Sequence, residues 1–112
     1  MPECIFCRDL PKVLENNLAY AVYDINPLTP GHMLVIPKRH HLTLFDSTPD
    51  EIKAIFELIH QAKTLIVKEH NPDGFNITAN CGAAAGQIVM HAHVHLLPRY
   101  EGQPFNPRTL IH

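Results

Sequence analysis

One long helix signal divides this chain into two strand-rich parts. Thr48-Pro49-Asp50-Glu51 has the pattern of a helix start, with a Thr cap, Pro at the first helical position and Glu where a capping box places it. Asn71-Pro72-Asp73-Gly74 predicts its end after about 22 residues. Between them, apolar residues recur at three- and four-residue steps, which is typical of an amphipathic helix: Ile52, Ile55, Phe56, Ile59, Ala62 and Ile66.

The segments on either side of the helix have the composition of β-strands. Four strands are expected at residues 18–24, 32–37, 75–80 and 88–97, and a short fifth at residues 13–16. Strands, one helix and then more strands predict an α+β fold, in which the helix packs on an antiparallel sheet of about five strands. The length of 112 residues fits a single domain, with a core at residues 4–99 and a C-terminal tail at residues 100–112.

Charge and hydropathy exclude two classes of partner. The chain has 9 Lys and Arg against 11 Asp and Glu, so it has no basic field that would hold a nucleic acid. Its apolar runs are far shorter than the roughly 20 residues of a membrane span. The first residues lack the basic and apolar regions of a secretory signal. A cytoplasmic protein without a nucleic-acid or membrane partner is therefore expected.

Nine histidines are present, and three of them alternate as His91-Ala92-His93-Val94-His95. In a strand, residues two apart point to the same face, so the three imidazoles would project together over about 13 Å. Packing alone does not explain this pattern, because three buried imidazoles would need three sets of hydrogen-bond partners. Two chemistries remain open: a metal site, or a nucleophilic imidazole whose neighbours fix its tautomer.

Three blocks of sequence resemble the histidine-triad (HIT) nucleotide hydrolases and transferases of the bacterial type. They are residues 87–99 (Gln-Ile-Val-Met-His-Ala-His-Val-His-Leu-Leu-Pro-Arg), residues 24–40 (Asp-Ile-Asn-Pro-Leu-Thr-Pro-Gly-His-Met-Leu-Val-Ile-Pro-Lys-Arg-His) and residues 80–87 (Asn-Cys-Gly-Ala-Ala-Ala-Gly-Gln). The resemblance covers nearly all of residues 4–99. It implies cleavage of a nucleoside phosphoramidate or dinucleoside polyphosphate at the α-phosphate, through a covalent nucleotidyl-histidine and without a metal in the chemistry.

The resemblance also implies a role for individual residues. His93 matches the nucleophile, and the carbonyl of His91 matches the acceptor that fixes its proton. The remaining matches concern a bound purine nucleotide: His95 and His32 beside the phosphate, Asn80 and Gln87 as amides that contact phosphate and leaving group, Asp24 on the ribose, Ile25 beside the base, and main-chain N–H groups around Ile88. Members of the family form two-fold dimers whose sheets join through the long helix and a strand, so a homodimer is expected.

A structural zinc site is the second implication. Cys4-x-x-Cys7 supplies two soft ligands, and tetrahedral zinc needs two more. In the zinc-containing relatives these are the histidine that matches His40 and the first triad histidine, here His91. His41 is an alternative to His40, and a reduced cysteine pair without metal is the competing interpretation. A zinc hydrolase with all three triad histidines as ligands would leave Cys4 and Cys7 unexplained.

Two features depart from the family pattern. After the glutamine most members carry Ser or Thr, whose hydroxyl bonds the phosphate or the leaving group, whereas this chain has Ile88. The tail also lacks the Trp-containing ending of the phosphoramidase branch. Ile88 is the main argument for an alternative function, a purine-nucleotide-binding or scaffolding module with little turnover.

Overall fold

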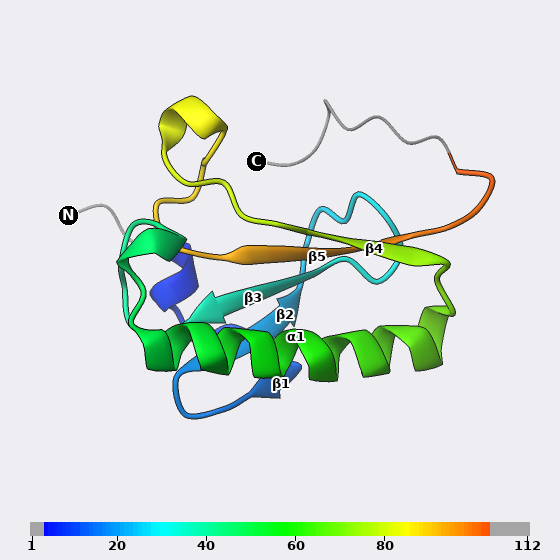
Figure 1. The fold of residues 1–112 in the computed structure, drawn as a ribbon, viewed down its shortest axis with the longest axis horizontal. Coiled ribbons are helices and arrows are strands. Elements are labelled where there is room, and N and C mark those ends of the chain that lie inside the picture. The colour runs from blue at the N-terminus through cyan, green and yellow to red at the C-terminus, as the bar shows by residue number, and fades with distance from the viewer. Residues whose placement is uncertain (1–3, 104–112) are drawn as a thin grey trace.

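The computed structural model describes residues 4–103. A single antiparallel sheet has the strand order β1-β2-β3-β5-β4, and one helix lies across one of its faces (Figure 1). The bounds are β1 (Leu14–Glu15), β2 (Ala19–Tyr23), β3 (Met33–Pro37), α1 (Pro49–His70), β4 (Gly74–Thr78) and β5 (Val94–Arg99), with three short 3-10 turns, η1 (Ile5–Cys7), η2 (Leu44–Asp46) and η3 (Ala83–Ala85). The expected α+β architecture is confirmed.

The helix begins and ends at the residues that the sequence predicts. The Thr48 hydroxyl accepts from the Glu51 N–H at 3.2 Å, and the Glu51 carboxylate accepts from the Thr48 N–H at 2.8 Å, which completes the capping box. Asn71 closes the helix in the left-handed conformation, with φ at 49°. The first end is therefore fixed by a side-chain cap, and the second by the left-handed backbone of Asn71, whose N–H donates to the carbonyl of Val67.

The predicted apolar stripe of α1 was wrong at one edge. Phe56 is 46% exposed, and Ile52 is only partly buried. Leu58 and Ala54 occupy the interface with the sheet instead. Phe56 follows the fully buried Ile55 by one position, which rotates it about 100° around the helix and away from the sheet.

The two faces of the sheet have different coverings. Alternate residues of the central strands pack under α1, at Ala19 and Ala21 of β2, Met33 and Val35 of β3, and Val94 and Leu96 of β5. Their neighbours face the other way and pack with Phe6 of the N-terminal segment, at Tyr20, Val22, Leu34 and Ile36. Leu34 pairs with His95, so His95 also lies on this second face. The candidate site is therefore built on the face opposite α1.

The last strand begins and ends later than the sequence predicts. It was expected at residues 88–97, but β5 begins at Val94 and continues to Arg99. His91 and His93 precede the strand, and the N–H of Ala92 donates to the carbonyl of His41 at 2.8 Å rather than to a strand. Pairing of β5 with β3 starts at Val94, so His91 and His93 lie outside the paired part of the sheet. Among the helices described, none has the length and apolar character to cross a membrane.

Candidate active site

A cavity of about 370 Å³ opens on the face of the sheet opposite α1. Its volume is in the range of small-molecule sites. The polar side chains on its wall include Asp24, His32, His93, His95 and Arg8. The apolar wall includes Phe6, Val22, Leu28, Leu34, Ile25, Ile88 and Val89. A mostly apolar pocket with convergent polar groups at one end is suited to a base and a phosphate.

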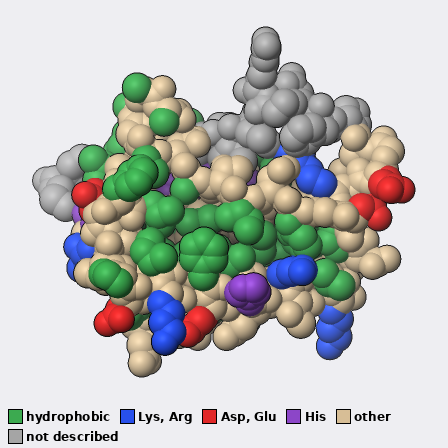
Figure 2. All heavy atoms as spheres, viewed as in Figure 1, with side chains coloured by type: hydrophobic (Ala, Val, Ile, Leu, Met, Phe, Trp, Pro, Cys, Tyr) green, Lys and Arg blue, Asp and Glu red, His purple; other side chains and the backbone are tan. Residues whose placement is uncertain are grey.

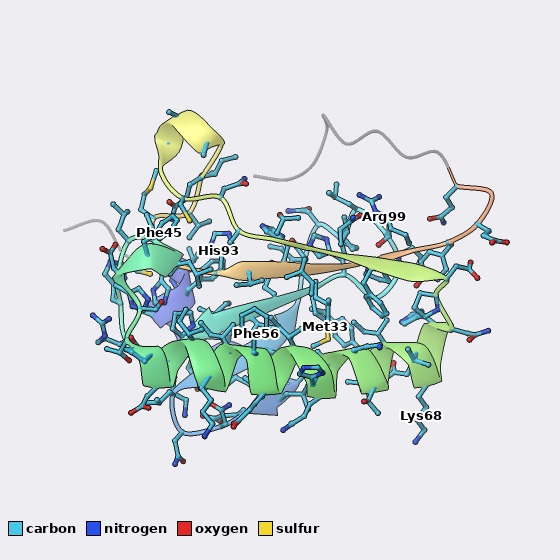
Figure 3. All side chains as sticks on the ribbon, in the orientation of Figure 1. Met33, Phe45, Phe56, Lys68, His93 and Arg99 are labelled. Atoms are coloured by element: carbon cyan, nitrogen blue, oxygen red, sulfur yellow. The ribbon has the colours of Figure 1, made fainter. Side chains whose placement is uncertain are left out.

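His93 is held in one tautomer by the main chain. It is buried beside β5, at the end of the sheet nearest η1 (Figure 3). Its Nδ1 lies 2.8 Å from the carbonyl oxygen of His91. A carbonyl can only accept, so the neutral ring keeps its proton on Nδ1 and has its lone pair on Nε2. The Phe6 ring packs edge-on against it at 5.0 Å between centroids. His93 therefore has the electronic arrangement of an imidazole nucleophile.

A second pair of histidines has its proton positions fixed in the same way. The N–H of Leu28 donates to Nδ1 of His32 at 3.2 Å, so neutral His32 holds its proton on Nε2. That Nε2–H donates to Nδ1 of His95 at 2.9 Å, so neutral His95 holds its own proton on Nε2. His95 is thus a hydrogen-bond donor through Nε2, whereas His93 presents a lone pair there. The ring centroids of His93 and His95 lie 5.1 Å apart.

Asp24 stands at the rim of the cavity, directly after β2. Its Oδ1 accepts from the N–H of Asn26 at 2.9 Å, and its Oδ2 lies 3.6 Å from Nε2 of His32. Ile25, the next residue, is almost fully exposed, and Ile88, which also lines the cavity, is 66% exposed. In a bound nucleotide, a ribose hydroxyl could contact the Asp24 carboxylate, and the base could contact Ile25 and Ile88.

Gln87 and Asn80 lie differently from the expectation. Neither is among the described residues that line the cavity. The Gln87 side chain is buried, and its amide bonds to main chain at both ends: Nε2 donates to the carbonyls of Leu42 at 2.7 Å and Val89 at 3.1 Å, and Oε1 accepts from the N–H of Gly82 at 2.8 Å. In this conformation Gln87 fastens the loop of residues 82–90 and offers no donor to the cavity.

The two cysteines and two histidines near the N-terminus form a compact cluster. Nδ1 of His91 lies 3.3 Å from Sγ of Cys4 and 3.5 Å from Sγ of Cys7, and Nδ1 of His40 lies 3.4 Å from Sγ of Cys7. The two Nδ1 atoms are 3.1 Å apart. Tetrahedral zinc, with bonds of about 2.3 Å to sulfur and about 2.0 Å to nitrogen, requires separations of about 3.3–3.8 Å. The three sulfur–nitrogen distances lie in this range, and the nitrogen–nitrogen distance is slightly shorter, so the four residues are compatible with a structural zinc ion.

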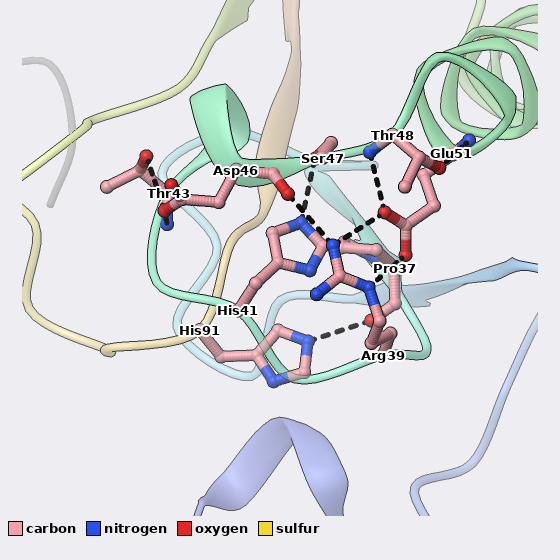
Figure 4. Close-up of polar contacts among 9 residues, drawn as sticks. All are labelled: Pro37, Arg39, His41, Thr43, Asp46, Ser47, Thr48, Glu51 and His91. Carbon is pink, nitrogen blue, oxygen red and sulfur yellow. Dashed lines mark hydrogen bonds and ion pairs between the residues drawn. The ribbon is translucent and has the colours of Figure 1, made fainter.

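The hydrogen bonds around this cluster support the same four residues as zinc ligands. Nε2 of His91 lies 2.7 Å from the carbonyl of Pro37, so its proton sits there and Nδ1 faces the cysteines (Figure 4). Burial lowers the pKa of His91, although the bond to Pro37 acts the other way. His41 turns away, with Nε2 2.7 Å from the Ser47 hydroxyl. His40, and not His41, therefore lies with the cysteines.

The two residues between the cysteines also line the cavity, which was not predicted from the sequence. Ile5 and Phe6 form η1 and line the cavity, and Phe6 also packs against the ring of His91 at 5.9 Å. The Tyr20 hydroxyl donates to the Phe6 carbonyl, and burial raises the pKa of Tyr20 to about 12, so it stays a donor. The sequence pattern could have predicted this, because two large apolar residues inside a Cys-x-x-Cys turn are expected to pack against a neighbouring apolar surface.

Comparison with known proteins places this geometry in a family. Residues 9–102 match the HIT domain family. The chain belongs to the HIT family. This HIT protein is 37% identical over 105 residues to adenylylsulfatase HINT3 of Arabidopsis thaliana, a match that covers 88% of the chain and 53% of HINT3. The chain thus spans about half the length of HINT3.

Two further relatives of this HIT protein bear on its chemistry. Adenosine 5′-monophosphoramidase HNT1 of Candida albicans is 34% identical over 106 residues, which cover 86% of the chain and 70% of HNT1. The crystal structure of a Zn-bound histidine triad family protein from Mycobacterium smegmatis matches with a TM-score of 0.83 at 32% identity, over 93% of this chain and 80% of that one. The HIT fold is thereby shown.

Proposed function

We propose that this HIT protein is a nucleotide hydrolase that cleaves a nucleoside phosphoramidate or a dinucleoside polyphosphate at the α-phosphate, through a covalent nucleotidyl-His93. The observation that carries the proposal is the tautomer of His93, whose Nδ1 proton is fixed by the His91 carbonyl at 2.8 Å. The named activities of HINT3 and HNT1, both on adenosine 5′-phosphate derivatives, support the substrate class.

The reaction would proceed in two displacements at phosphorus. Nε2 of His93 attacks the α-phosphorus, the P–N or P–O bond to the leaving group breaks, and the leaving group departs with that electron pair and takes up a proton. Water then attacks the same phosphorus and loses one proton to solvent, which balances the proton taken up by the leaving group. The bond to Nε2 breaks with its electron pair returning to His93, and the nucleoside monophosphate leaves with the hydroxyl from water. His95 donates from Nε2 to a phosphate oxygen, and Asp24 accepts from the ribose.

Zinc, where bound by Cys4, Cys7, His40 and His91, would have a structural role in this scheme. A closed four-ligand site supplies a cross-link and has no position for a reacting water. His93 and His95 make their ring bonds to the His91 carbonyl and to His32, so the three triad imidazoles are directed to three different partners. This arrangement favours nucleophilic chemistry over a zinc hydrolase with three triad ligands.

A homodimer is part of the proposal. β4 is the edge strand next to β5, and Ile77 on it is 52% exposed. Apolar side chains gather between α1 and β4, with Phe56 among them (Figures 2 and 3). A second copy that adds its own β4 edge would cover this patch through a two-fold axis.

Trapping of the intermediate tests the function. The protein is incubated with adenosine 5′-phosphoramidate or adenosine 5′-phosphosulfate, quenched in alkali and analysed by mass spectrometry of its peptides. An AMP adduct on the peptide with His93 is expected. His93→Ala should lose the adduct and turnover but still bind AMP, whereas His60→Ala, which removes an exposed helix histidine, should keep both. Turnover retained in His93→Ala would overturn the proposal.

One observation favours a second candidate, a purine-nucleotide-binding module with little turnover. Gln87 is bonded to main chain at both ends of its amide, and Ile88 presents no hydroxyl to the cavity. Assistance to the leaving group would then be weak. The same experiment separates the candidates, because a binding module retains AMP affinity without forming the adduct.

A further inference from the structure

Residues 37–42, which begin at the last residue of β3, carry three main-chain carbonyls that bind the loop of residues 87–92. The Pro37 carbonyl accepts from Nε2 of His91 at 2.7 Å. The His41 carbonyl accepts from the N–H of Ala92 at 2.8 Å, and the Leu42 carbonyl accepts from Nε2 of Gln87 at 2.7 Å. The loop of residues 87–92 is therefore docked on this one segment, and the His91 carbonyl in turn fixes the proton of His93.

The segment is itself held to α1 through one ion pair. Nε and Nη2 of Arg39 donate to the two carboxylate oxygens of Glu51 at 3.0 and 2.9 Å, and Nη2 also donates to the Asp46 carbonyl at 2.8 Å (Figure 4). Glu51 is only 3% exposed, and its bond to Arg39 lowers its pKa to about 2, so the pair is ionised. A two-pronged guanidinium–carboxylate contact fixes direction as well as distance.

We propose that Arg39 and Glu51 are positioning residues for the reaction at His93. α1 packs across the sheet, and its buried face contributes half of the residues of the core between them. The ion pair between Arg39 and Glu51 fixes residues 37–42 relative to α1. The carbonyls of that segment set the main chain at His91 and thus the ring of His93. Neither Arg39 nor Glu51 lines the cavity. The inference rests on the proposed function, because it concerns the same nucleophile.

A purely structural role for Glu51 is the competing explanation, because Glu51 also caps α1. Two control variants separate the two roles. Thr48→Ala removes the hydroxyl that accepts from the Glu51 N–H and weakens the same helix end, but leaves the ion pair in place. Glu15→Gln removes an exposed ion pair from Lys38, the neighbour of Arg39, without touching Glu51.

The test compares Arg39→Lys and Glu51→Gln with these controls, well below each melting temperature. Lysine keeps the charge but cannot bridge both carboxylate oxygens. A displacement near 1 Å at the nucleophile would lower kcat on adenosine 5′-phosphoramidate by roughly 10- to 100-fold, with KM within about three-fold. Thr48→Ala and Glu15→Gln should keep kcat within about two-fold of the parent protein, although Thr48→Ala melts at a lower temperature.

A second measurement needs no substrate. In Arg39→Lys, hydrogen exchange of the Ala92 amide and of the Gln87 side-chain amide should be faster, and in Thr48→Ala it should not. Unchanged exchange in Arg39→Lys, or an equal loss of kcat in Thr48→Ala, would overturn the inference. If the parent protein has no turnover, the proposed function fails, and the exchange comparison still decides whether the pair positions the loop.

Discussion

The carbonyl oxygen of His91 lies 2.8 Å from Nδ1 of His93, so a residue of the cluster that could hold a metal ion also fixes the proton of the candidate nucleophile. The same His91 donates from Nε2 to Pro37 and turns Nδ1 toward Cys4 and Cys7. His91 therefore makes contacts through its carbonyl and through both ring nitrogens. The cysteine–histidine cluster and the orientation of the candidate nucleophile meet at His91.

The first prediction concerns zinc. Protein purified without added metal should contain about one zinc per chain, measured by elemental analysis. His40→Ala should lose most of it, because Nδ1 of His40 faces Cys7, and His41→Ala should retain it, because that ring bonds Ser47. Chelation should lower the melting temperature more than the activity per folded molecule. Equal zinc content in both variants would contradict the assignment of His40.

The sequence was sufficient for the fold, but not for the path of the main chain through His91 and His93. The helix from Pro49 to His70 was predictable because caps and apolar periodicity are local signals. The start of β5 at Val94 was not, because it depends on a distant partner, the His41 carbonyl that takes the Ala92 N–H away from the sheet. Local alternation cannot report a competing bond that comes from 51 residues away.

The candidate site was also predictable only in part. The structure brings His93, His95, His32 and Asp24 to one cavity, as the motifs indicate. It keeps Gln87 out, because the buried amide finds main-chain partners at Leu42 and Gly82 that no sequence pattern records. The C-terminal tail expected at residues 100–112 lies outside the described residues from position 104 onward.

A second prediction concerns the tautomer of His95. His32→Ala removes the Nε2–H that donates to Nδ1 of His95, so His95 can hold its proton on either nitrogen. The loss of one positioned donor should lower kcat about 100-fold. AMP should still bind, because Asp24 remains. Nitrogen chemical shifts of the His95 ring report its tautomer directly, and a ring that stays protonated on Nε2 with nearly unchanged kcat would show that His32 does not direct it.

A third prediction concerns pH. Arg39 holds the pKa of Glu51 at about 2, below its usual 4.5, so the pair contributes stability above pH 4.5 that is lost as the pH falls toward 2. The free energy of unfolding of the parent protein should exceed that of Glu51→Gln by a constant amount above about pH 5.5, and the difference should shrink on acidification. Denaturant unfolding at several pH values measures it. A difference that is as large at pH 3 as at pH 6 would refute the lowered pKa.

A fourth prediction concerns the dimer. Ile77→Lys places a charge on the exposed edge of β4 and should convert a dimer into a monomer, as measured by light scattering after gel filtration. Leu18→Lys is the matched control, because Leu18 is exposed beside β2, away from the β4 edge of the sheet. A parent protein that is already monomeric at tens of micromolar would rule out the proposed dimer.

The last prediction concerns the leaving group. Ile88 lines the cavity with an exposed apolar side chain where most family members have a hydroxyl, and the Gln87 amide is engaged with main chain, so the departing atom lacks a side-chain donor from these two positions. Such a donor is typically worth about 2.7–4 kcal/mol in the transition state, or 10²–10³ in rate. The loss matters most for a leaving group that departs poorly without a proton. Good leaving groups, such as sulfate or a nucleotide polyphosphate, should therefore be released faster than alkyl amines. Ile88→Ser should raise kcat on alkyl phosphoramidates selectively, and Ile88→Val, which reduces size without adding a donor, should not. An equal change on both substrate classes would show that position 88 acts on substrate binding and not on the departing group.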